Sequence, residues 1–224
     1  MELGHGAPPI RSPPPYPWRT ARRDHRLVLG RRYVRRVTYA VVVLAGGAAR
    51  RLHGVAKPLL TVEGTALVRR VLDAAGTATP RVVVGPPDLL PALPPGTVLT
   101  REDPPGGGPV AALRAGVALI PARVETVVVL AGDLPFVTGE TVDALLAARA
   151  EVAVLLDDTG RRQHLLAAWR AGLLRAALSR SASPAVRDLF QGVRPAEVPP
   201  PRGLPAWLDC DTPEDLDRAR RLLS

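Results

Sequence analysis

Lys57 is the residue whose type and position point most directly to chemistry. It is the one lysine in a chain whose other 29 basic residues are all arginines. A lysine offers a compact ammonium on a flexible stem, which a planar guanidinium cannot replace where shape matters. Lys57 ends the segment LAGGAARRLHGVAK (44–57), in which Gly46 and Gly47 follow an apolar run. Turn amides beside an ammonium predict phosphate binding, and the alternative is a surface lysine.

Two further segments carry residues suited to a nucleotide or a metal ion. REDPPGGGPVAAL (101–113) places three glycines before a proline, so a base or ribose could approach the backbone while Asp103 accepts its hydrogen bonds. VVVLAGDLPFV (127–137) sets Asp133 directly after a predicted buried strand, a natural place for a Mg²⁺ ligand beside phosphates. The alternatives are a flexible loop that caps a helix and an aspartate that caps a turn.

The segment WLDCDTPEDL (207–216) combines a helix start with two further acids. Residues 212–215 fit an N-cap threonine, a first-turn proline and an acid at the third helical position. That role leaves Asp209 and Asp211 unexplained, because they alternate on an extended stretch before the helix. Both could share a metal ion with Asp133.

The elements that must position these residues alternate between short apolar runs and longer runs of helical spacing. This alternation predicts a mostly parallel sheet that is covered on both faces. A tight DDTGRR turn near the middle of 152–169 indicates one antiparallel edge, and ligands of such sheets bind where the strand order reverses. The expected strands are 39–44, 81–85, 97–100, 126–133, 152–156 and 164–169, and the expected helices are 66–75, 110–120, 140–150, 171–178, 185–190 and 211–223.

Composition bounds the class of protein. The 224 residues are 46% hydrophobic, which is enough for the core of one α/β domain. The single cysteine, Cys210, excludes an internal disulfide framework and a cysteine-cluster zinc site. No apolar stretch approaches the roughly 20 residues that span a bilayer, so no membrane partner is expected and the cytoplasm is the simplest compartment.

The net charge of +9 is concentrated in the first part of the chain. Residues 1–37 hold nine arginines against Glu2 and Asp24, so the remaining residues carry only about +2. We therefore expect no nucleic-acid surface on the body. The sequence predicts a disordered Pro/Arg-rich tail (1–37) and one folded domain (38–224). The tail is either a basic arm for an acidic partner or nucleic acid, or the product of a start codon assigned too far upstream.

The motifs LAGG with its later Arg, Gly and Lys, then GGGPVAAL, AGDLPFV and DxDTPEDL, resemble the MobA-type molybdenum cofactor guanylyltransferases of the nucleotidyltransferase superfamily. The resemblance covers about residues 38–224. It implies a Rossmann-like three-layer α/β sandwich. It also implies transfer of GMP from GTP to Mo-molybdopterin, with Mg²⁺ as cofactor and pyrophosphate as the second product. The Gly-Gly pair after Leu44 favours guanylyl over cytidylyl relatives, which tend to have Ala-Gly there.

The resemblance also implies roles for individual residues. Lys57 matches the family's phosphate-binding lysine, and Asp133 matches its magnesium-binding aspartate. The residues themselves, apart from the resemblance, indicate that Arg51 adds charge beside the phosphates and that Asp209 and Asp211 are further candidate metal ligands. The predicted nucleotide-binding residues are Leu44, Ala45, Gly46, Gly47, Lys57, Asp103 and Gly108, and the predicted catalytic residues are Lys57, Arg51 and Asp133.

The chain departs from the family pattern at several positions. His53 stands where glycine is usual, Ala56 where an acid is common, and Gln163-His164 where a His-Pro pair near the pterin is frequent. Asp209 and Asp211 occupy positions where the family often has asparagine. These departures leave the pterin contacts open.

Three alternative functions therefore remain. The first is a cytidylyltransferase for the same pterin, and the second is a guanylyltransferase that acts on 2-phospholactate. The third is a non-catalytic nucleotide-binding adaptor that hands cofactor to a molybdoenzyme or a delivery chaperone.

Overall fold

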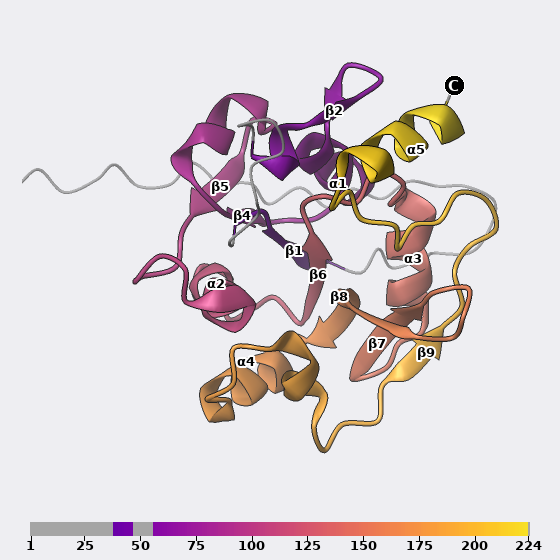
Figure 1. Ribbon diagram of the computed structural model, residues 1–224. Helices are drawn as coiled ribbons and strands as arrows, with labels where there is room; N and C mark the ends of the chain where they lie inside the picture. Colours follow the sequence, from indigo (N-terminus) through magenta and orange to yellow (C-terminus); the bar gives the residue numbers. More distant parts are fainter. Residues whose placement is uncertain (1–37, 47–55, 224) are drawn as a thin grey trace, which may run out of the picture. The chain divides into compact units, whose positions relative to one another are not determined.

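The computed structural model describes residues 38–46 and 56–223, so the predicted tail lies outside the described part. A seven-stranded sheet in the order β5-β4-β1-β6-β8-β7-β9 runs between helices on its two faces (Figure 1). The strands are β1 (Tyr39–Leu44), β2 (Thr61–Val62), β3 (Thr65–Ala66), β4 (Arg81–Val84), β5 (Thr97–Thr100), β6 (Thr126–Ala131), β7 (Val152–Leu156), β8 (Arg162–Arg170) and β9 (Ala196–Val198). The α-helices are α1 (Leu67–Ala74), α2 (Gly108–Ala118), α3 (Gly139–Ala147), α4 (Ala171–Arg180) and α5 (Pro213–Leu223), and the 3₁₀ helices are η2 (Lys57–Leu59), η3 (Pro87–Ala92) and η4 (Val186–Phe190).

Strands β5, β4, β1 and β6 form the parallel half of the sheet. The chain passes from β1 to β4 and then β5 on one side, and returns to β6 on the other side of β1. The strand order therefore reverses beside β1, and the carboxyl ends of β1 and β6 flank the place where an open α/β sheet binds its ligand. The mostly parallel, helix-covered sheet that the sequence predicts is confirmed.

The other half of the sheet contains the antiparallel strand. β8 pairs antiparallel with both β6 and β7, so the predicted antiparallel pair is confirmed. This β7–β8 pair does not itself form the edge of the sheet, because β9 pairs parallel with β7 and is the edge strand. Three residues give no readable alternation, so the sequence pattern does not reveal β9. The same holds for β2 and β3, whose antiparallel pair is two residues long on each side.

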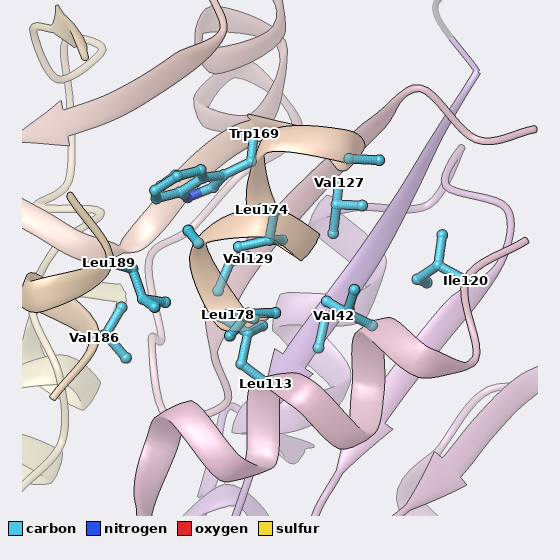
Figure 2. Close-up of a cluster of buried hydrophobic side chains, with 14 of the residues drawn as sticks. Val42, Leu113, Ile120, Val127, Val129, Trp169, Leu174, Leu178, Val186 and Leu189 are labelled. Carbon is cyan, nitrogen blue, oxygen red and sulfur yellow. The ribbon is translucent and has the colours of Figure 1, made fainter. Parts of the chain in front are cut away.

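Helices α2 and α4 cover one face of the sheet (Figure 1). Figure 2 shows Leu113 of α2 and Leu174 of α4 beside Val42 and Trp169 of the sheet, all of them buried. Gly116 allows α2 to pack closely, since a Cβ there would stand 2.6 Å from the Val42 Cγ1 atom. α2 begins two residues earlier than expected, at Gly108.

Helices α1 and α3 cover the opposite face with a second buried cluster. Val41 and Val43 of β1 point into this cluster, whereas Val42 points into the first. Both faces of β1 are therefore apolar, which is why the strand reads as a continuous hydrophobic run. Within the described residues, no helix has both the length and the apolar character needed to cross a membrane.

Helix α5 packs on a third, smaller cluster beside the β2–β3 pair. Its buried members include Val62, Phe136, Cys210 and Leu216. Phe136 lies shortly after β6, so this cluster draws the start of α5 toward the end of that strand. The last helix is thereby connected to the carboxyl ends of the strands, at the place beside β1 where the strand order reverses.

Candidate active site

The ends of β1, β4 and β6 approach one another unusually closely. Gly132 donates a hydrogen bond to the Leu44 carbonyl at 2.8 Å, and Ala45 donates one to the Val84 carbonyl at 2.8 Å. A Cβ at Gly132 would lie 2.8 Å from the Ala45 Cβ, and a Cβ at Gly85 would lie 2.9 Å from the Ala45 carbonyl oxygen. Glycine is therefore required at Gly85 and Gly132, and the next residue after Gly132, Asp133, is placed beside the end of β1.

Lys57 is buried and paired. It opens η2, and its Nζ atom donates to the Asp211 Oδ1 atom at 2.5 Å. The Lys57 side chain is 9% exposed, whereas the Asp211 side chain is 62% exposed. The surface-lysine alternative is therefore wrong for Lys57. A buried ammonium requires an anionic partner, because burying an unpaired charge is costly.

The carboxylates around Lys57 repel one another. The pKa of Asp133 is raised to about 6, chiefly by burial. The Asp209 and Asp211 carboxylates also raise this pKa, and each has a larger effect than the opposing effect of Lys57. Burial also raises the pKa of Asp209, with the Asp211 carboxylate as the next cause. Among the described residues, three carboxylates thus lie near a single ammonium group, that of Lys57. This excess of negative charge favours the binding of an additional cation.

The chemistry of these donors fits a hard divalent cation. Carboxylate oxygens are the ligands that Mg²⁺ and related ions prefer, and their excess negative charge would be neutralised on binding. Within residues 38–46 and 56–223, no three His, Cys, Asp or Glu side chains already stand close enough together to hold a metal ion. An ion here would therefore take one or two protein oxygens and complete its shell with phosphate and water oxygens, as Mg²⁺ commonly does.

The burial of Cys210 explains why Asp209 and Asp211, on either side of it, both point away from the core. The Cys210 side chain is fully buried with Phe136 and Leu216, so the residues on either side of it face the opposite way on the extended segment. Burial, followed by the nearby carboxylates, raises the pKa of the Cys210 thiol to about 12. The thiol is therefore neutral and inaccessible, and Cys210 serves packing rather than catalysis.

The start of α5 has the predicted capping box. The Asp215 backbone N–H donates to the Thr212 Oγ1 atom at 3.2 Å, and the Thr212 backbone N–H donates to the Asp215 Oδ2 atom at 2.9 Å. This reciprocal pair satisfies amides at the helix start. It accounts for Thr212 and Asp215 and holds the backbone that carries Asp211.

The glycine-rich loop between β5 and α2 is shaped by Glu102, a residue that the sequence motifs do not single out. Glu102 is 5% exposed, and its Oε1 atom accepts a hydrogen bond from the Gly106 backbone N–H at 3.0 Å. Its Oε2 atom is buried and has no partner among the described residues. Gly106 and Gly108 adopt positive φ angles of 85° and 86°, which favour glycine. The only sequence signal for Glu102 is its place beside Asp103 after the strand.

The structure brings together only part of the predicted site. Lys57, Asp133, Asp209 and Asp211 form one electrostatic cluster, and Leu44, Ala45 and Gly46 lie at the adjoining end of β1.

Asp103 is exposed and makes no hydrogen bond or ion pair within the described residues. Gly108 opens α2 beside Pro184, where a Cβ would lie 3.2 Å from the Pro184 Cβ. The predictions for Gly47 and Arg51, and the departure at His53, lie outside the described residues.

The departure at residues 163–164 has a local structural explanation. The Gln163 Nε2 atom donates to the Asp157 Oδ2 atom at 2.9 Å, which closes the turn between β7 and β8. The His164 ring meets the Phe190 ring edge-on, with ring centroids 4.8 Å apart. Burial, followed by nearby arginines, lowers the pKa of His164. Gln163 therefore has its partner in the β7–β8 turn, and His164 has its partner in η4.

Sequence comparison agrees with this geometry. The family described as "MobA-like NTP transferase domain" matches residues 41–198, which contain most of the sheet. The chain belongs to this family. Its class is therefore nucleotidyltransferase, and the predicted resemblance to the MobA-type enzymes is confirmed.

Two curated relatives show the extent of the similarity. The chain is 31% identical over 191 residues to a molybdenum cofactor guanylyltransferase of Cereibacter sphaeroides, covering 81% of this chain and 95% of that one. It is 37% identical over 119 residues to a probable molybdenum cofactor guanylyltransferase of Methanosarcina acetivorans, covering 47% of this chain and 51% of that one. The match to the archaeal protein thus spans about half of its length.

Solved structures share the fold at lower identity. Molybdopterin-guanine dinucleotide biosynthesis protein A of Archaeoglobus fulgidus has a TM-score of 0.65 at 22% identity, covering 82% of this chain and 98% of that one. A Mycobacterium tuberculosis protein in complex with manganese has a TM-score of 0.66 at 21% identity, covering 82% of this chain and 98% of that one. These neighbours confirm the predicted α/β nucleotidyltransferase fold.

Proposed function

We propose that this protein transfers GMP from GTP to Mo-molybdopterin, forming the guanine dinucleotide cofactor and releasing pyrophosphate. The observation that carries the proposal is the buried Lys57 ammonium among the carboxylates of Asp133, Asp209 and Asp211, at the sheet edge where the strand order reverses. The family membership and the names of the curated relatives support the choice of substrates.

The reaction needs alignment and charge neutralisation more than covalent help. A phosphate oxygen of the pterin attacks the α-phosphorus of GTP in line, and the bond from that phosphorus to the bridging oxygen breaks. Pyrophosphate leaves with the bonding electron pair. The nucleophile is already ionised, so no general base is required, and the neutral, buried Cys210 is not used. The catalytic gain comes from positioning and from fixed charges.

Each side chain has a role that its surroundings permit. Lys57 would exchange its Asp211 partner for a phosphate oxygen of the leaving pyrophosphate. Gly46, which is half-buried directly after Ala45 at the end of β1, would offer its backbone N–H to a further phosphate oxygen. Asp133 would hold Mg²⁺, with either Asp211 or Asp209 as a second protein ligand, and the bound ion would neutralise part of the phosphate charge.

The direct test is pyrophosphate release by the full chain with Mo-molybdopterin and Mg²⁺, comparing GTP with CTP. We expect release with GTP and little with CTP. Preferential release with CTP would retain the fold and chemistry but overturn the guanylyl assignment. Nucleotide binding without release, in protein shown to be folded by circular dichroism, would instead support the non-catalytic adaptor.

A further inference from the structure

The ion pair between Lys57 and Asp211 has two very unequal partners. The Lys57 side chain is 9% exposed and enclosed by protein, whereas the Asp211 side chain is 62% exposed. Asp211 can therefore rotate into water without burying an unpaired charge. Lys57 has no such freedom, so any departure of Asp211 must be matched by the arrival of another anion.

A triphosphate without a metal ion is poorly matched to this cluster. With its acids ionised, the cluster holds the carboxylates of Asp133, Asp209 and Asp211 against the ammonium of Lys57, so negative charge is in excess. A metal-free triphosphate would have to displace Asp211 and then lie beside all three carboxylates. A divalent cation changes this balance, because it offers the released Asp211 and the phosphates a common positive partner.

We propose that Asp211 is a specificity-determining residue that holds Lys57 until a nucleotide arrives together with its divalent cation, so that the metal-free nucleotide binds weakly. This inference rests on the proposed function, because it takes a nucleoside triphosphate as the ligand of Lys57. It assigns Asp211 a role before the chemical step, which is to couple nucleotide binding to metal binding.

The coupling has a measurable form. If metal ion and nucleotide each favour binding of the other, the two affinities must change by the same factor. We expect the wild-type chain to bind GTP about 100-fold more tightly with Mg²⁺ than in EDTA, a factor within the usual range of such couplings. Removing the Asp211 charge should free Lys57 and strengthen metal-free binding by about tenfold.

The experiment is calorimetric titration of GTP into the full chain, in Mg²⁺ and in EDTA, for wild type and Asp211→Asn. The expected result is tighter binding of the variant in EDTA, with unchanged or weaker binding in Mg²⁺. A residue that served only as a metal ligand would leave the EDTA value unchanged, and that result would overturn the proposal. Asp211→Ala provides a second variant, and circular dichroism confirms that each one is folded.

Two control variants each remove one carboxylate charge, as Asp211→Asn does. They distinguish the effect of the Lys57–Asp211 ion pair from the general electrostatic effect of losing an acid. Asp217→Asn removes an acid from α5 that pairs with Arg220 at 3.2 Å, and it should leave both affinities unchanged. Asp209→Asn removes an acid of the cluster that is not the partner of Lys57, and its effect in EDTA should be clearly smaller than that of Asp211→Asn. Equal effects of the two cluster variants would refute a specific role for Asp211.

The outcomes also distinguish the two proposals. If the wild-type chain binds GTP and Asp211→Asn binds it no more tightly in EDTA, the coupling role of Asp211 fails and the proposed function stands. If no variant binds GTP with or without Mg²⁺, the proposed function fails, and the role of Asp211 fails with it.

Discussion

Asp133 and Glu102 are two acids at equivalent places in the sheet, yet their surroundings differ. Each lies two residues beyond the end of a parallel strand, Asp133 after β6 and Glu102 after β5. Glu102 accepts a hydrogen bond from the Gly106 amide of its own loop. Asp133 instead lies near further carboxylates from the segment before α5, and burial followed by these carboxylates raises its pKa. The same position in the fold thus holds an acid that fixes the shape of its own loop in one case and an acid that belongs to a cluster of carboxylates in the other.

Replacing Asp133 should have the largest effect on activity. We expect Asp133→Ala to abolish metal-dependent pyrophosphate release, a loss of at least about 100-fold in kcat/KM, because the proposed ligand of the cation that neutralises the phosphates disappears. The measurement is initial rate against Mg²⁺ concentration. Full activity in this variant would remove Asp133 from the metal site.

Lys57→Ala should have the next largest effect. We expect a loss of at least about tenfold in kcat/KM, equivalent to about 1.4 kcal/mol of transition-state stabilisation. Lys57→Arg is the matched variant, since it retains the charge but not the compact shape that the buried site encloses. Activity of the arginine variant close to wild type would show that charge alone suffices there.

The raised pKa of Asp133 predicts a stability effect of opposite sign to the activity effect. The folded-state pKa is about 6 against an ordinary value of 3.8, so folding disfavours the ionised form. The loss of folding stability caused by ionised Asp133 is therefore absent below about pH 4, grows as the pH rises and is complete above about pH 6. We therefore expect Asp133→Asn to raise Tm at pH 7 in EDTA and to match wild type below pH 4. A lower Tm at pH 7 would contradict this account.

Glu102 should give the smallest effect and sharpen the contrast with Asp133. Glu102→Ala removes the acceptor for the Gly106 amide, so the glycine-rich loop loses one hydrogen bond worth about 1 kcal/mol. We expect KM for GTP to rise about fivefold with kcat little changed, because loop order rather than phosphate charge is affected. Glu102→Gln retains an acceptor oxygen and should restore most of the affinity. A fall in kcat as large as that of Asp133→Ala would place Glu102 in the reaction itself.

The elements of the fold were largely predictable because their signals are local. The apolar run of β1, the helical spacing of α1 and the capping box of Thr212 and Asp215 each depend on neighbours within a few residues. The same holds for the turn between β7 and β8. Very short elements such as β9 have too few residues to carry a pattern, and only pairing with β7 reveals them.

The candidate site was predictable only in part, since its contacts join distant parts of the chain. The sequence alone predicted Lys57, Asp133 and the acids before α5 as the residues suited to phosphate and metal chemistry. Only the tertiary structure decided that Lys57 is buried against Asp211, 154 residues away, and that Glu102 turns inward while Asp103 stays exposed. Residue type states which charges a chain possesses, but burial and partner depend on how separate elements pack, and no local pattern records that packing.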